Sequence, residues 1–266
     1  MPRRYATDSG RSAKPSARST DMTGRHERHP GGGREVGVLI LDTRFPRIPG
    51  DVGHPGTFDF PVLYERVREA SPRRVVREAD PSLLAPFREG ARALARRGAA
   101  AITTTCGFLV PFQDALAEAA GVPVLTSSLL LVPLVARLCG PGQTIGILTI
   151  ERRSLTPAHL AAAGIGAATP VVVAGMEEAG AGLFARQILD DEPELDVDGC
   201  RAEHRAAARR LVAEHPKVAA IVLECANMPP YRADVHAVTA RPVWDLTDLV
   251  RLVHAGLSST HPPHLA

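Results

Sequence analysis

Two cysteines stand in matching sequence settings 119 positions apart, and this repetition suggests chemistry. The stretch AAITTTCGFLVPF, residues 100–112, aligns without a gap with AAIVLECANMPPY, residues 219–231, and pairs Cys106 with Cys225. A thiolate can serve as a base at neutral pH when its surroundings lower the thiol pKa. Two such bases on opposite faces of one carbon could remove a proton from one side and return one to the other, which inverts the stereochemistry.

Each of these cysteines follows a predicted strand and precedes a predicted helix. A helix N-terminus carries unpaired N–H groups and a partial positive charge, which favour the thiolate. We therefore expect lowered pKa values for Cys106 and Cys225. A single cysteine at a strand end is more often a small buried hydrophobe, so the catalytic interpretation depends on the duplication. Cys139 and Cys200 lack this symmetry and are interpreted as structural residues.

The elements that must position the cysteines are also duplicated. VGVLI at 36–40 matches IGILT at 145–149 with an offset of 109, so the two matches differ by an ordinary loop indel. Continuous apolar runs of this kind are typical of buried parallel strands. Strands are predicted in VGVLILD, PVLYERV, AAITTT and PVLTSS, and again in TIGILTI, TPVVVAG, AAIVLE and PVWDL; helices are predicted at residues 82–97, 109–120 and 248–257.

Alternating strands and helices predict parallel sheets with right-handed crossovers. The expected fold class is α/β, with two pseudo-symmetric doubly wound lobes and the active site in the cleft between them, beyond the carboxyl ends of the strands. The expected boundaries are a disordered basic tail at 1–34, a first lobe at 35–133, a second lobe at 134–245, a helix at 246–258 that packs back on the first lobe, and a tail at 259–266.

Charge and composition exclude several classes of function. Residues 1–34 hold eight of the 31 basic residues and three of the 29 acidic ones, so the remainder is slightly acidic and nucleic acid is not expected as a partner. No apolar run reaches the length of a membrane span. Four cysteines without a CxxC pair or an export signal favour a cytoplasmic protein with reduced thiols. The sequence leaves open whether the protein forms a homodimer.

No cofactor or metal is expected. The chain has two lysines: Lys14 lies in the tail, and Lys217 precedes its strand, at the wrong end of the sheet for a pyridoxal phosphate enzyme. Motifs for a P-loop, a dinucleotide-binding loop, a serine-hydrolase elbow or a zinc-binding histidine pair do not occur. Proton transfer would thus be the work of side chains alone.

With its paired cysteines and duplicated α/β units, the chain resembles the aspartate/glutamate racemase superfamily over roughly residues 35–257. The resemblance implies cofactor-independent racemisation or epimerisation of a small chiral carboxylate, an amino acid or a hydantoin-like compound, with Cys106 and Cys225 as catalytic residues. The flanks differ from those of amino-acid racemases: they read Cys-Gly-Phe and Cys-Ala-Asn, where Cys-Asn-Thr and Cys-Thr-His are usual. The substrate is therefore not carried over from the family.

Three readings stay open: a two-cysteine racemase, an enzyme resembling maleate isomerase or arylmalonate decarboxylase on the same fold, and a two-lobed binding protein without catalysis. Strand ends and the flanks of the cysteines supply the candidate substrate-binding residues, although the same residue types also favour turns and caps. These candidates are Asp42, Thr43, Thr105, Gly107, Thr149 and Asn227, with Arg47 as a weaker candidate for a carboxylate.

Overall fold

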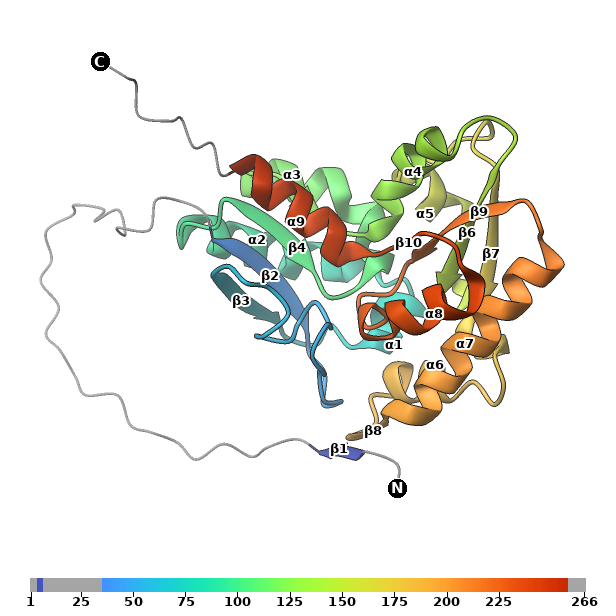
Figure 1. Cartoon of the computed structure of the whole chain (residues 1–266). Helices are drawn as coiled ribbons and strands as arrows, with labels where there is room; N and C mark the ends of the chain where they lie inside the picture. The colour runs from blue at the N-terminus through green and yellow to red at the C-terminus, as the bar shows by residue number, and fades with distance from the viewer. Residues whose placement is uncertain (1–3, 7–34, 258–266) are drawn as a thin grey trace, which may run out of the picture.

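Two four-stranded sheets, each with all its strands parallel, organise the chain (Figure 1). The computed structural model describes residues 4–6 and 35–257. The first sheet has the order β3 (Val62–Val67), β2 (Val36–Leu41), β4 (Ala101–Thr104), β5 (Val124–Leu125). The second has the order β7 (Val171–Gly175), β6 (Thr144–Thr149), β9 (Val218–Leu223), β10 (Val243–Trp244).

The duplication seen in the sequence is a duplication of topology. The matched apolar runs form β2 and β6, and the matched runs that precede the cysteines form β4 and β9. In each lobe these two strands are hydrogen-bonded neighbours in the middle of the sheet. The predicted two-lobed α/β fold is confirmed.

Helices cover the faces of both sheets (Figure 1). Their bounds are α1 Pro72–Val76, α2 Leu84–Arg96, α3 Gln113–Ala120, α4 Val132–Cys139, α5 Pro157–Ala162, α6 Leu183–Leu189, α7 Val197–Glu214, α8 Arg232–Thr239 and α9 Leu246–Leu257. Both clusters of buried apolar residues draw members from the two lobes, so the lobes share their core.

A glycine in the first strand of each lobe lets a helix approach the sheet. A Cβ built on Gly37 of β2 would lie 2.9 Å from Leu94 of α2, and one built on Gly146 of β6 would lie 2.9 Å from Leu211 of α7. Both contacts are closer than a real side chain tolerates. The repeated glycine in VGVLI and IGILT therefore marks equivalent helix–sheet contacts.

The last helix, α9, lies over the first lobe although it follows the second in sequence (Figure 1). His254 stacks on Phe60 with ring centroids 3.7 Å apart, and Arg251 donates a hydrogen bond to the carbonyl of Thr57 at 2.8 Å. Helix α9 therefore packs on the loop that precedes β3, in the lobe that also holds Cys106.

The structure departs from the predicted elements in two places. The helix expected at 109–120 starts as a 3₁₀ helix, η2 (Gly107–Phe112), because Pro111 lies within it, and the α-helix α3 begins only at Gln113. Of the tail expected to be disordered, β1 (Arg4–Ala6) pairs antiparallel with β8 (Glu194–Asp196). The rest of that tail and residues 258–266 lie outside the described residues. None of the described helices has the length and apolarity needed to cross a bilayer.

Candidate active site

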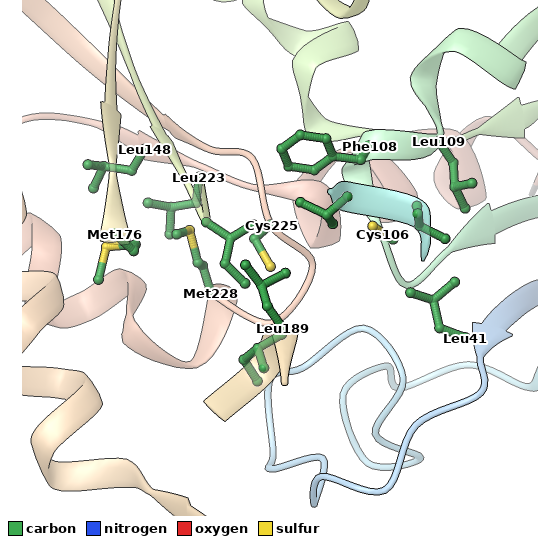
Figure 2. Packing of buried hydrophobic residues seen from close by; sticks show 14 of the residues in the cluster. Leu41, Cys106, Phe108, Leu109, Leu148, Met176, Leu189, Leu223, Cys225 and Met228 are labelled. Atoms are coloured by element: carbon green, nitrogen blue, oxygen red, sulfur yellow. The ribbon is translucent and has the colours of Figure 1, made fainter. Parts of the chain in front are cut away.

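Cys106 and Cys225 line one small closed cavity, which we call the inner cavity. Figure 2 shows both cysteines within the same cluster of buried apolar side chains, which come from the two lobes. The inner cavity has a volume of about 10 Å³, the room for one water molecule. Its other lining residues are mostly apolar: Leu41, Phe45, Pro72, Val76, Thr105, Gly107, Phe108, Ile150, Ile188, Leu189, Glu224 and Asn227.

Equivalent strand ends place the two thiols. The N–H of Thr105, just after β4, bonds the carbonyl of Leu39 on β2 at 3.0 Å. The N–H of Glu224, just after β9, bonds the carbonyl of Leu148 on β6 at 2.8 Å. Each sheet thus extends its hydrogen bonding by one residue, and the next residue in each lobe is the cysteine. The expectation that the paired cysteines share one cavity follows from this symmetry.

Both thiols are protonated in this closed state. Burial raises the pKa of Cys106 and the pKa of Cys225, and the carboxylate of Glu224 raises both further. The predicted lowering of their pKa values is therefore wrong for this state. The helix that follows Cys106 is a short 3₁₀ helix, and Cys225 caps no helix because Met228 is the N-cap of the next one, η6 (Pro229–Tyr231).

The two thiols differ in their charged surroundings. The guanidinium of Arg47 acts against the rise in the pKa of Cys106. The carboxylate of Asp51 adds to the rise in the pKa of Cys225. Cys106 therefore becomes a thiolate more readily than Cys225, and the pseudo-symmetry of the backbone does not extend to the electrostatics.

Glu224 lies inside the site and was not among the sequence candidates. Its side chain is fully buried and accepts a hydrogen bond from the hydroxyl of Thr149 through Oε2 at 2.9 Å. Within the described part of the chain, Oε1 has no hydrogen-bond partner. Burial raises the pKa of this carboxyl group to about 7. The signal in the sequence was an acidic residue at the end of an otherwise apolar strand, directly before the cysteine.

A second polar group, formed by Arg47, Asp51 and Asn227, borders the inner cavity. Arg47 Nη1 lies 2.9 Å from Asp51 Oδ1, and both side chains are nearly buried. The amide of Asn227 donates to Asp51 Oδ2, and its own oxygen accepts from the thiol of Cys225 at 3.5 Å. Arg47 Nη2 also donates to Thr105 Oγ1 at 3.4 Å. Asp51 was missed because it lies in a loop without a motif.

The structure divides the six predicted binding residues into three groups. Thr105, Gly107 and Asn227 line the inner cavity. Thr149 lies behind the cavity and acts on it only through Glu224.

The prediction is not supported for Asp42 and Thr43, which lie outside the cavity lining. Asp42 is half-buried and accepts from Arg66 and from the N–H of Glu69, which is the turn chemistry that strand ends favour. Thr43 contacts only Arg47 among the site residues, at 3.3 Å.

A larger cavity of about 390 Å³, the outer cavity, adjoins the inner one at the boundary of the lobes. Val76 and Phe108 line both cavities, so they separate the outer space from the thiols. The outer cavity is mainly apolar and has Arg77 and Arg153 in its wall. A substrate larger than water fits beside the thiols only when the inner cavity widens, and Val76 and Phe108 are the lining residues that the two cavities share.

The described residues contain no group of three His, Cys, Asp or Glu side chains arranged to hold a metal ion. The chemistry that the observed side chains can perform is proton transfer. Two thiols, one carboxyl group and an arginine supply it, in a site from which the apolar lining excludes bulk water.

Comparison with known proteins places residues 65–251 in a family described as Asp/Glu/Hydantoin racemase. A dimethylsulfoniopropionate lyase of Durusdinium sp. clade D is 32% identical over 217 residues, which cover 79% of this chain and 70% of that protein. Six further matches are also named dimethylsulfoniopropionate lyases, and the chain spans from 46% to 73% of the length of these curated relatives.

Solved structures share the fold at low sequence identity. Unliganded arylmalonate decarboxylase matches with a TM-score of 0.55 and 16% identity, over 84% of this chain and 91% of that one. Allantoin racemase from Klebsiella pneumoniae matches with a TM-score of 0.53 and 19% identity, over 83% of this chain and 89% of that one. At such identities the likeness concerns the fold alone.

Proposed function

This chain belongs to the Asp/Glu/hydantoin racemase family. We propose that it is a lyase in which a cysteine removes the proton on the carbon next to the substrate's carboxylate. This step releases dimethyl sulfide from dimethylsulfoniopropionate or a close analogue. One observation carries the proton-abstraction step: thiols line a small, mostly apolar cavity in which a cysteine can act as the base. The name shared by the relatives supports the substrate.

The proposed reaction is a β-elimination. The thiolate takes the α-hydrogen as a proton, and the C–H electron pair becomes the second bond between Cα and Cβ. The bond from Cβ to sulfur breaks, its electron pair stays on sulfur, and the products are neutral dimethyl sulfide and acrylate. The thiol then returns its proton to water. No oxidant, reductant or metal takes part in this balance.

The electrostatics favour Cys106 as the base. Arg47 stabilises its thiolate, whereas Cys225 has Asp51 and Glu224 as its charged neighbours. Arg47 also contacts Thr105, which lines the cavity beside Cys106. A substrate carboxylate bound by Arg47 and Thr105 would bring its α-carbon next to Cys106. The bound anion would also be kept away from Glu224.

Racemisation of a chiral carboxylate is the second candidate. The observation that favours it is that both lobes contribute a thiol, because elimination needs one base while inversion needs two. In this reaction the thiol of Cys225 would protonate the face opposite to Cys106.

Proton NMR in D₂O separates the two candidates. Dimethylsulfoniopropionate incubated with the protein is expected to give dimethyl sulfide and acrylate. A panel of single enantiomers of amino acids and hydantoins is expected to show no α-hydrogen exchange. Exchange with inversion in that panel, and no acrylate from dimethylsulfoniopropionate, would reject the lyase in favour of the racemase.

A further inference from the structure

The position of Glu224 is matched in the first lobe by a residue without charge. Thr105 and Glu224 each precede the cysteine of their lobe. The hydroxyl of Thr105 accepts the N–H of Leu41 at 3.1 Å, and the carboxylate of Glu224 accepts the equivalent N–H of Ile150. Holding the end of the neighbouring strand thus requires only a neutral acceptor.

The negative charge of Glu224 is therefore not required by the fold, and one of its two carboxylate oxygens, Oε1, has no structural role among the described residues. Oε2 is held by the hydroxyl of Thr149, while Oε1 has no partner in the described structure although Glu224 is fully buried. A buried carboxylate oxygen without a partner is costly. The position of Oε1 is also marked by Gly107, because a Cβ on this glycine would overlap it. Both residues line the inner cavity.

Among the described residues, Glu224 is the one carboxyl group that lines the inner cavity. The other ionisable lining residues are the two cysteines, whose thiols are neutral in the closed state. Arg47 and Asp51 border the cavity and bind each other. The side of the cavity next to Cys225 therefore presents an unbalanced negative charge, which attracts a cation and repels the carboxylate of a substrate.

We propose that the carboxylate of Glu224 is the counter-ion for a positively charged group on the substrate, and that it selects carboxylates whose leaving group is a cationic sulfonium. This inference rests on the proposed function, in which the sulfonium leaves as a neutral thioether. Glu224 pairs with the cation in the bound substrate, and Phe45 and Phe108 supply apolar surface for the methyl groups. Carboxylates of the same shape that lack the positive charge leave the carboxylate of Glu224 unpaired and bind weakly.

Two unreactive ligands of equal shape test this selection. The zwitterion 3-(trimethylammonio)propionate and its carbon analogue, the anion 4,4-dimethylpentanoate, differ by the one positive charge of the ammonium group, and calorimetry gives the dissociation constant of each. At pH 8 the wild-type protein is expected to bind the ammonium ligand at least about tenfold more tightly. Glu224→Gln keeps the shape of the side chain and is expected to bring the ratio of the two constants near one.

The affinities of the two ligands should also change with pH, in opposite directions. Below the pKa of about 7 the carboxyl group of Glu224 is neutral, so at pH 6 the ammonium ligand loses its counter-ion and binds less tightly, while the carbon analogue is no longer repelled and binds more tightly. Thr149→Val removes a hydrogen bond to the charged form, so it should move this pH dependence upward. The titratable groups that interact with Glu224 are Cys106 and Cys225. Arg47 and Asp51 pair with each other at the border of the cavity, and Glu151, next to Ile150 in sequence, pairs with Arg77 and Arg153.

Glu151→Gln is the matched control, because Glu151 is an equally buried glutamate that is paired with Arg77 and Arg153 outside the inner cavity. It should leave the ratio unchanged. Equal affinity of the wild-type protein for both ligands at pH 8, or a ratio that Glu224→Gln does not alter, overturns the cation site. If the ratio behaves as expected while dimethylsulfoniopropionate is not cleaved, the cation site holds and the proposed elimination is wrong.

Discussion

Replacing Gly107 with alanine should damage the fold and the site together. The added Cβ would overlap Glu224 Oε1, would lie 2.5 Å from the carbonyl oxygen of Glu224, and would lie 2.9 Å from Ser127 Oγ. The carboxylate can rotate, but the carbonyl belongs to the end of β9 and cannot move alone. We expect a loss of about 3 kcal/mol in the free energy of unfolding, at the upper end of overpacking effects.

The assay is urea unfolding, in which this loss lowers the midpoint by about 1 M for a protein of this size. Displacing Cys106 by about 1 Å should also reduce turnover about 100-fold. Gly166→Ala is the matched control, since a Cβ at Gly166 meets no atom within 4 Å. A Gly107→Ala protein that unfolds at the wild-type urea concentration and keeps its activity would refute the close packing of Gly107 on Glu224.

Three further predictions concern buried charges and use urea unfolding across pH. Arg47→Met leaves Asp51 as a buried charge without its ion-pair partner and should lower the free energy of unfolding by about 3 kcal/mol. Adding Asp51→Asn to this variant should recover part of the loss. If the double variant instead lost the sum of the two single losses, the pairing would be contradicted. The pKa of Glu224 is raised from 4.5 to about 7, so the free energy of unfolding should fall by about 3 kcal/mol as the pH rises from 4.5 to 7. Glu224→Gln should remove this decrease; the same pH dependence of stability in the wild-type and variant proteins would reject the prediction. Burial lowers the pKa of His204 from 6.5 to about 4, so the free energy of unfolding should fall by about 3 kcal/mol as the pH falls from 6.5 to 4. His204→Phe should flatten this dependence of stability on pH. An unchanged dependence would show that His204 is not the group responsible.

The fold could be predicted because each of its decisive features has a local signal. Apolar runs gave the strands, and the matched glycine in VGVLI and IGILT appears in both lobes where a helix leucine meets the sheet. The start of α3 was predicted too early, because Pro111 was not used as the signal that separates the 3₁₀ helix η2 from the α-helix that follows it. The pairing of β1 with β8 depends on residues nearly 190 positions apart and has no local signal.

The site could be predicted only in part, for a physical reason. Strand ends are visible in sequence, so both cysteines, Thr105 and Asn227 could be assigned to one cleft. The pKa values of the thiols could not be predicted, because desolvation depends on side chains from both lobes and outweighs the effect of a helix end.

Glu224 shows the same limit at a single position. The sequence Leu-Glu-Cys shows that an acidic residue precedes the cysteine. That one of its oxygens lacks a hydrogen-bond partner can be seen only in the structure, where Thr149 and Gly107 lie next to it. Asp42 shows the reverse case, since a polar residue after a strand was expected at the site and instead forms a turn.

The most direct test of proton abstraction by cysteine compares single serine variants on dimethylsulfoniopropionate, with acrylate followed by proton NMR. Serine keeps the size of the side chain but is too weak an acid to replace the thiolate. Cys106→Ser should reduce turnover at least about 1000-fold, Cys225→Ser should reduce it less, and Cys139→Ser, outside the cavity lining, should leave it unchanged. Wild-type turnover in both Cys106→Ser and Cys225→Ser, or damage by Cys139→Ser alone, would contradict the assignment.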